Sequence, residues 1–337
     1  MKILVEDSTW NNVGDGWYQT SLFFLLKKLY PEHDVCIGEG PIRRSFRIDS
    51  RWQKNNALAL LDYESADIHV FSGPMIPSIV QDYSQAIRRI IERGEQYVLI
   101  SASGTGLSQT AISTIGQFLK DFPPLFFASR DEETFHNFSP YVKNSYNGIC
   151  TAFLVDKTIP LSTFKLDKPF FISSFYTELE PTFLVPRGEE ATVENLQVQH
   201  RKTICGLPFK YSRHLDWLRQ NKQEEVGDKL IVRTIQNLNT RFNHINFSMP
   251  NSFISFNPVK YLEVVKSSEF TISDRVHACA VSLACGHPAR FLFKTPRAGI
   301  FDRMGFDYIS NGGVMYPNMG KIEMEQELLE KKILSAF

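Results

Sequence analysis

The chain has 337 residues, of which 43% are hydrophobic. This length suits two domains of about 150 residues each, and the apolar share is sufficient for their cores. Lysine and arginine together number 37, as do aspartate and glutamate, so the formal net charge of zero does not indicate the cationic surface typical of nucleic-acid binding. No segment reaches the roughly 18 uninterrupted apolar residues needed for a membrane span.

Cysteine usage and the N-terminal residues favour a cytoplasmic protein. The five cysteines are scattered, and none forms a Cys-x-x-Cys pair, so neither a disulfide framework nor a zinc site is indicated. They are Cys36, Cys150, Cys205, Cys279 and Cys285. The apolar run Met1–Val5 is too short for a signal peptide. Work on a lipid-linked substrate would take place at the inner face of the membrane.

The chain opens with a predicted strand over Lys2–Glu6, a polar loop and an apolar helix. The loop contains Asn12-Val13-Gly14-Asp15-Gly16. Strand, glycine-containing loop and helix form the first unit of a doubly wound α/β domain, where ligands bind at the carboxyl ends of strands. Glycines at 14 and 16 let the backbone approach a ligand. Asp15 is interpreted first as a helix cap and alternatively as a group that accepts a proton from a hydroxyl.

Strands and helices then alternate through the first half. Strands are predicted over Asp67–Phe71, Tyr97–Ser101 and Leu125–Ala128, and helices over Gln85–Arg93, over Ile112–Phe122 and from Asp131 onward. The strands end in small or polar residues, namely Ser72-Gly73, Ala102–Gly106 and Ser129-Arg130-Asp131. This alternation predicts a parallel sheet flanked by helices.

A basic segment lies between the first two of these units. Its arginines are Arg43, Arg44, Arg47 and Arg51. We interpret it as a solvated loop, with an approach to an anionic acceptor as the lesser alternative.

A proline-rich region from Pro160 to Pro186 predicts a linker, after which a second α/β series begins. Its predicted strands are Phe170–Phe175, Lys229–Thr234 and Arg290–Phe293, and its helices are Tyr211–Gln220, Val259–Lys266, Ile300–Met304 and Glu323–Leu334. We therefore expect an N-terminal domain over 1–165, a C-terminal domain over 166–320 and a terminal helix over 321–337. Two doubly wound, Rossmann-like domains facing each other across a cleft resemble a GT-B architecture.

The most informative segment runs from Ser267 to Pro288. Ser273 and Asp274 are expected to cap a helix whose residues are small or apolar on all sides, which predicts burial. Arg275 and His277 fall in its first turn, where unpaired N–H groups and the macrodipole attract anions. These side chains suit a phosphate or carboxylate ligand. The alternative is that they merely cap a buried helix against neighbouring carbonyls.

Taken together, these segments resemble the polysaccharide pyruvyl transferase family. The matching elements are Asn12-Val13-Gly14-Asp15, Ser72-Gly73, Arg130-Asp131, Ser273-Asp274-Arg275-Val276-His277, Gly286-His287-Pro288, Arg297 and Gly305. They occur in the family's order and cover nearly the whole chain. The chain departs from the family pattern at Pro74, where a second glycine is usual, at Cys150, where aspartate is common, and at Arg297, where lysine is expected.

The resemblance implies transfer of pyruvate from phosphoenolpyruvate to two hydroxyls of a sugar in a cell-surface or extracellular polysaccharide or its precursor, giving a cyclic ketal and phosphate. Arg275, Arg130 and Arg297 are the expected donor-binding cations, because guanidinium groups match carboxylate and phosphate. His277 is expected to be the general acid and Asp15 the hydroxyl-side base. Further residues expected to line the substrate site are Asn12, Gly14, Ser72, Gly73 and Asp274. No metal or other cofactor is implied, and the acceptor is a saccharide, either free or lipid-linked.

Two alternatives remain open at the level of sequence. One is a GT-B glycosyltransferase that uses a nucleotide sugar, because fold does not determine function. The other is a non-catalytic relative that binds carbohydrate or anions without turnover.

Overall fold

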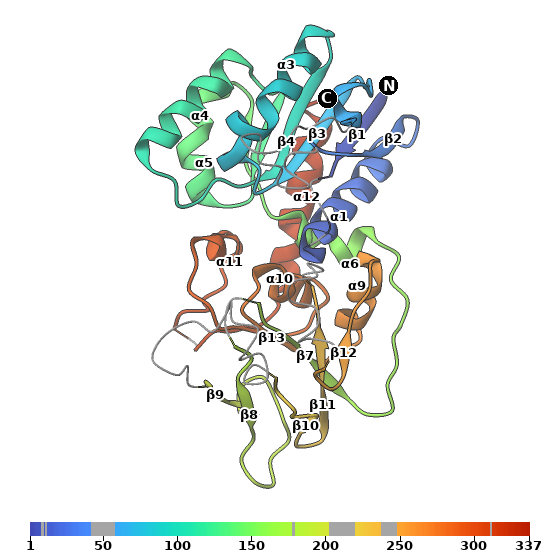
Figure 1. Ribbon diagram of the computed structural model, residues 1–337, viewed down its shortest axis with the longest axis vertical. Helices are drawn as coiled ribbons and strands as arrows, with labels where there is room; N and C mark the ends of the chain where they lie inside the picture. Colours follow the sequence, from blue (N-terminus) through green and yellow to red (C-terminus); the bar gives the residue numbers. More distant parts are fainter. Residues whose placement is uncertain are drawn as a thin grey trace.

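The computed structural model describes residues 1–7, 10, 12–41, 58–176, 179–201, 220–236, 248–310 and 312–337. The basic segment at 43–51 and the helix predicted over 211–220, apart from its last residue, lie outside the described residues, as does Cys205. Within the described part the chain forms two α/β halves, stacked one above the other in Figure 1.

The first half is built on a sheet of six parallel strands. The strands are β1 (Lys2–Glu6), β2 (Asp34–Gly38), β3 (Ile68–Gly73), β4 (Gln96–Ala102), β5 (Phe126–Ser129) and β6 (Ser145–Asn147). Their order is β2-β1-β3-β4-β5-β6. The direction of winding reverses between β1 and β3, and in open α/β sheets ligands bind at the carboxyl ends of strands beside such a reversal. The helices are α1 (Val13–Leu29), α3 (Ser84–Glu92), α4 (Gln109–Asp121), α5 (Glu132–Phe138) and α6 (Val155–Thr158).

The second half carries a mixed sheet with the order β10-β11-β7-β13-β14-β15, and β12 also pairs with β11. Its strands are β7 (Phe170–Ser174), β10 (Glu225–Val226), β11 (Lys229–Thr234), β12 (Ser252–Phe253), β13 (Thr271–Ser273), β14 (Ala289–Phe291) and β15 (Val314–Met315). β10 and β15 are antiparallel edge strands, and the strands between them are parallel. β8 (Thr182–Leu184) and β9 (Gln197–Gln199) pair to form a separate, antiparallel two-stranded ribbon. The helices are α9 (Pro258–Lys266), α10 (Val276–Ala284), α11 (Gly299–Met304) and α12 (Met319–Leu334).

Apolar packing is continuous between the halves. The largest core cluster contains Trp17 of α1, Phe153 of a buried 3-10 turn (Thr151–Leu154) and Val281 of α10. Across this contact between the halves, which we call the seam, the Trp17 indole donates to the carbonyl of Pro258 at 3.1 Å. The two halves are therefore joined by shared core rather than by a linker alone.

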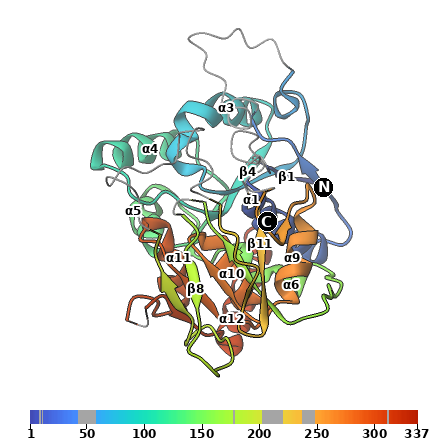
Figure 2. The ribbon, with the colours of Figure 1, turned by 60° about the horizontal axis from the view of Figure 1, so that its bottom comes forward.

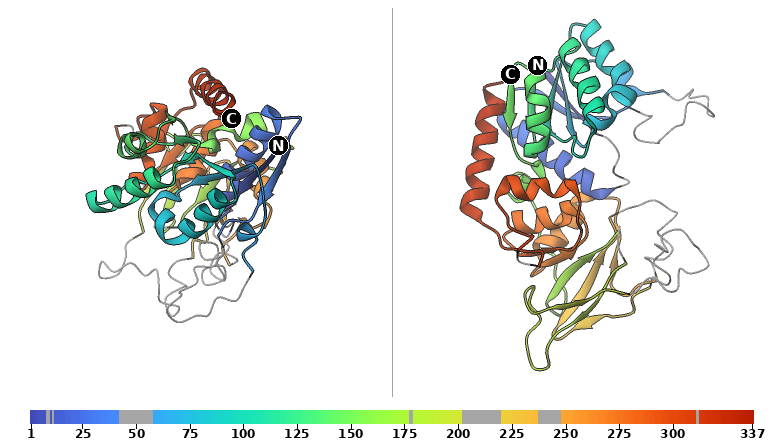
Figure 3. Two further views of the ribbon diagram at one scale, coloured as in Figure 1. Left: turned by 90° about the horizontal axis from the view of Figure 1, so that it is seen from above. Right: turned by 90° about the vertical axis from the view of Figure 1, so that its left-hand side faces the viewer.

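The C-terminal helix α12 returns from the second half to the first, as the right-hand view of Figure 3 shows. The amide of Gln326 donates to the carbonyl of Phe153 at 2.7 Å, and the Tyr30 hydroxyl in the first half donates to the carbonyl of Phe337 at 2.7 Å. α5 and α11 are neighbours on another side of the seam (Figure 2). Helix α12, the shared core and the α5–α11 pair together fix the relative placement of the halves.

Candidate functional site

The first turns of α1 and α10, one from each half, meet at the seam (Figure 1). The Nη1 atom of Arg275 donates to Oδ1 of Asn12 at 3.1 Å. A β-carbon at Gly14 would lie 3.3 Å from Nδ1 of His277, so α1 backbone passes directly against the imidazole. We call these residues, Asn12–Gly14 and Arg275–His277, the α1–α10 junction. Each helix brings unpaired N–H groups and the positive end of its dipole to this point, which favours an anion there.

The start of α1 corrects one expectation. Asn12 is the residue that precedes the helix, and Asp15 lies inside the first turn, where its backbone N–H donates to the carbonyl of Asn12 at 2.9 Å. The preferred interpretation of Asp15 as the helix cap was therefore wrong. The N–H of Val13 donates to the carbonyl of Gln236 at 2.7 Å, so the second half satisfies one donor of this turn.

The start of α10 corrects another. The residue before this helix is Arg275, and no side chain caps it. Ser273 instead accepts a hydrogen bond from the backbone N–H of Arg275 at 2.9 Å, and Asp274 accepts two from the N–H of Tyr176 at 2.9 and 3.1 Å. Ser273 and Asp274 thus order the loops around the helix start and leave its N–H groups uncapped by side chains. As expected, residues Ala278–Ala284 are buried and Gly286 ends the element with a left-handed φ of 81°.

Arg130 and His277 meet although they lie 147 residues apart, with 3.2 Å between Nη1 and Nε2. A guanidinium can only donate, so Nε2 accepts and the proton of the neutral ring sits on Nδ1, the atom that faces Gly14. Burial and then the charges of Arg130, Arg297 and Arg275 lower the pKa of His277 well below its ordinary value. The imidazole is therefore neutral, and the charged groups that shift it are all cations.

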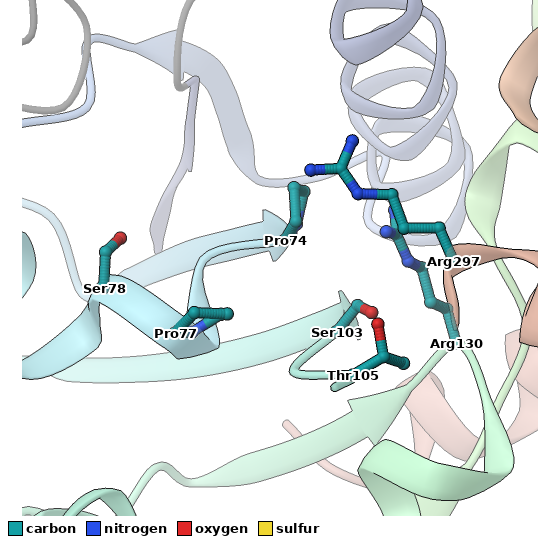
Figure 4. A pocket seen from close by; sticks show the side chains of 7 residues that line it. All are labelled: Pro74, Pro77, Ser78, Ser103, Thr105, Arg130 and Arg297. Atoms are coloured by element: carbon teal, nitrogen blue, oxygen red, sulfur yellow. The ribbon is translucent and has the colours of Figure 1, made fainter. Parts of the chain in front are cut away.

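Beside His277, a cavity of about 250 Å³ opens between the halves (Figure 4). It is lined by Pro74, Pro77, Ser78, Ser103, Thr105, Arg130 and Arg297. Arg130 follows β5, whereas Arg297 belongs to a 3-10 turn (Pro296–Ala298) of the second half. Both arginine side chains border this cavity together with Ser103 and Thr105. Two neighbouring guanidinium groups repel each other, and an anion between them would remove that cost.

Arg130 itself is poised for a ligand. It is 3% exposed, and its Nε has no hydrogen-bond partner among the described residues. A buried donor without a partner is costly, so its persistence points to a ligand that completes it. Ser72, at the end of β3, is also buried with an unpartnered Oγ in the described part of the chain.

Tyr18 is a site residue that sequence reasoning missed. Its ring centroid lies 5.1 Å from that of His277, and its hydroxyl is buried without a partner in the described ranges. Burial raises the pKa of Tyr18 well above its usual value. A β-carbon at Gly73, where φ is 76°, would overlap the Tyr18 hydroxyl, so glycine is required there for both conformation and space. In the sequence, Tyr18 resembles any core aromatic of an apolar helix.

Most of the expected site residues are thus brought together. Arg275 bonds Asn12, and His277 lies against both Gly14 and Arg130. Arg297 shares the cavity with Arg130, and Tyr18 lies between Gly73 and His277. Asp15 is partly exposed in the first turn of α1, and Asp274 is committed to a neighbouring backbone N–H. In the described ranges no group of His, Cys, Asp and Glu is placed to hold a metal ion, and no helix has the length and apolarity to span a membrane.

A family model for polysaccharide pyruvyl transferases matches residues 12–292, from the start of the α1–α10 junction through β14. The chain belongs to the polysaccharide pyruvyl transferase family. The match includes every expected site residue except Arg297. No curated protein matches the sequence significantly.

Solved structures resemble the protein in fold. S. aureus MnaA in its structure with UDP is 12% identical, with 99% of this chain and 91% of that chain covered and a TM-score of 0.52. A putative UDP-N-acetylglucosamine 2-epimerase from Listeria monocytogenes is 10% identical, with coverage of 99% and 90% and a TM-score of 0.51. These similarities confirm the predicted GT-B-like α/β architecture.

Proposed function

We propose that the protein transfers pyruvate from phosphoenolpyruvate to two hydroxyls of one sugar in a polysaccharide or its precursor. The observation that carries this proposal is the convergence of two helix N-termini and three arginines around a neutral histidine. Family membership supports the same reaction class. The described cysteines are unpaired, which favours a reducing, cytoplasmic setting.

The charges of the donor suit this arrangement. Phosphoenolpyruvate carries a carboxylate and a phosphate on the same central carbon, and each anion is matched by guanidinium groups. Arg130 and Arg297 flank the cavity at the seam, and Arg275 lies at the junction beside His277. We assign the phosphate to Arg130 and Arg297 and the carboxylate to Arg275 and the α10 N-terminus.

The reaction forms two C–O bonds and breaks one. Protonation of the methylene carbon generates a cationic centre at the neighbouring carbon, which the first sugar hydroxyl attacks. The bond from that carbon to the phosphate oxygen then breaks, and the second hydroxyl closes the ketal. Of the two hydroxyl protons, one balances the proton given to the methylene carbon and the other leaves with phosphate.

His277 acts as the acid in this scheme. In the free protein, burial and three cations keep its pKa low, but a bound phosphate and carboxylate offset those charges and raise the pKa again. The ring thus becomes a proton donor once the donor substrate is bound. Asp15, in the first turn of α1, is the candidate base for the sugar hydroxyl.

A nucleotide-sugar transferase is the second candidate, because the S. aureus fold relative was solved with UDP. In this chain, however, polar side chains at the carboxyl ends of β7 and β11 form hydrogen bonds within the protein. The Ser174 hydroxyl donates to the carbonyl of Thr234 at 3.0 Å, and the Gln236 amide donates to the Thr234 hydroxyl at 3.3 Å. Since these groups are satisfied internally, they favour the phosphoenolpyruvate reaction over nucleotide binding.

The test is phosphate release from phosphoenolpyruvate across a panel of mono- and disaccharides, with thermal unfolding as the binding readout. We expect phosphoenolpyruvate to raise the melting temperature and UDP-sugars to leave it unchanged. His277→Ala should abolish phosphate release while the protein remains folded, and His136→Ala, at an exposed position of α5, should retain it. Retained turnover in His277→Ala would remove this histidine from the mechanism, and stabilisation by UDP-sugars alone would favour the second candidate.

A further inference from the structure

Two exposed aromatic residues follow the carboxyl ends of β7 and β12, the two strands that pair in parallel with β11 in the second sheet. Tyr176 follows β7 and is 39% exposed, and Phe256 precedes α9 and is 86% exposed. Tyrosine and phenylalanine present a large, rigid apolar face, so such a ring beside a site can pack on a ligand.

Tyr176 is held in place by the residues of the site. Its backbone N–H donates to both oxygens of Asp274, which is 4% exposed. Its ring lies 4.8 Å from the guanidinium carbon of Arg275. The ring is therefore fixed against the cation that bonds Asn12, while part of it stays in solvent.

Residues on both sides of Phe256 are anchored. The backbone N–H of Ser255 donates to the Tyr261 hydroxyl at 2.9 Å, and Pro258 lies so close to Gly16 that a β-carbon there would be 2.7 Å from it. Consecutive Cα atoms are about 3.8 Å apart, so Phe256 lies within about 8 Å of a residue packed on the first turn of α1. This exposure costs apolar hydration with little packing gain inside the protein.

We propose that Tyr176 and Phe256 form the binding surface for the saccharide acceptor, each stacking on the apolar C–H face of a sugar ring. This inference rests on the proposed function and identifies the acceptor side of the same site. A sugar on Tyr176 would place hydroxyls beside Arg275 and the first turn of α1, where Asp15 lies. Phe256 would contact a neighbouring ring, so the surface favours an oligosaccharide over a monosaccharide.

The experiment measures saccharide binding without turnover, by saturation-transfer NMR with mono- and oligosaccharides and saturating phosphoenolpyruvate. We expect at least a five-fold loss of saccharide affinity in Tyr176→Leu and Phe256→Ser, and near-wild-type affinity in Tyr176→Phe, which keeps the ring. Tyr63→Leu is the matched control, because Tyr63 is 68% exposed and belongs to a turn before β3.

Several outcomes would overturn the inference. Unchanged saccharide affinity in Tyr176→Leu and Phe256→Ser would do so, and so would wild-type protein that binds no saccharide. If Tyr176→Leu weakens phosphoenolpyruvate stabilisation as strongly as saccharide binding, Tyr176 only positions Arg275. In each case a wild-type thermal shift with phosphoenolpyruvate would leave the donor proposal standing, so the two failures are distinguishable.

Discussion

Adding a methyl group at Gly14 tests whether the closeness of α1 to His277 matters for the reaction. An alanine β-carbon would lie 3.3 Å from Nδ1 and 3.4 Å from Cβ of His277, closer than ordinary contact. The imidazole would have to shift by a few tenths of an ångström, and its 3.2 Å contact with Arg130 would lengthen. Small misplacements of a catalytic group typically cost about ten-fold to a hundred-fold in rate, and we expect a loss of kcat in that range.

The stability of Gly14→Ala should move little. Replacing a helical glycine by alanine is worth up to about 1 kcal/mol in a helix interior and roughly half of that in a first turn. The tight contact offsets this gain, so we expect a melting temperature within about 2 °C of wild type.

Gly320→Ala provides the control, because Gly320 is likewise the second residue of its helix, α12, and has only Asn318 Oδ1 at 3.9 Å. Gly320→Ala should show the small gain in stability expected for alanine in a helix, with full phosphate-release activity. Wild-type activity in Gly14→Ala would refute the argument that this backbone positions His277.

Two further predictions concern the first half of the molecule. Gly73→Ala should destabilise the fold by about 2–4 kcal/mol, because a left-handed alanine costs about 1 kcal/mol and displacing the Tyr18 hydroxyl adds overpacking. Gly94→Ala, at the same φ of 76° with open space around it, should lower the free energy of unfolding in urea only by the cost of the left-handed alanine. Equal losses in both variants would contradict the steric argument. Burial raises the pKa of Glu6 to about 7, so its stabilising contribution is fully present below about pH 4.5 and is lost as pH rises through 7. The stability of wild type relative to Glu6→Gln should therefore fall from pH 5 to pH 8 in thermal unfolding. The contribution of Asp7, whose pKa burial raises to about 6, and the opposite contribution of His277, whose pKa burial lowers, are common to both proteins and cancel in this difference. A difference that does not change with pH would rule out Glu6 as a source of pH dependence.

The regular elements with strong apolar patterns were predictable. The strands Lys2–Glu6 and Lys229–Thr234 have the predicted bounds, and helices such as α4 and α9 differ by a few residues. β2 was missed because Asp34–Gly38 offers two apolar residues around a cysteine, and β10 and β12 because two-residue strands carry no periodicity. These short strands form because neighbouring strands supply their hydrogen-bond partners.

The site was predictable in part. The junction residues Arg275 and His277 were identified from the contrast between their polarity and the apolar helix behind them. The contact of His277 with Arg130 was not, because it joins positions 147 residues apart and depends on how the two halves stack. Tyr18 and Tyr176 were missed because only their surroundings distinguish them from ordinary aromatic residues.

A crystal structure with phosphoenolpyruvate bound tests the central claim most directly. We predict the phosphate between Arg130 and Arg297, and the carboxylate within hydrogen-bonding distance of Arg275 and the first turn of α10. A donor bound away from the seam, with no contact to Arg130, Arg275 or Arg297, would contradict the account.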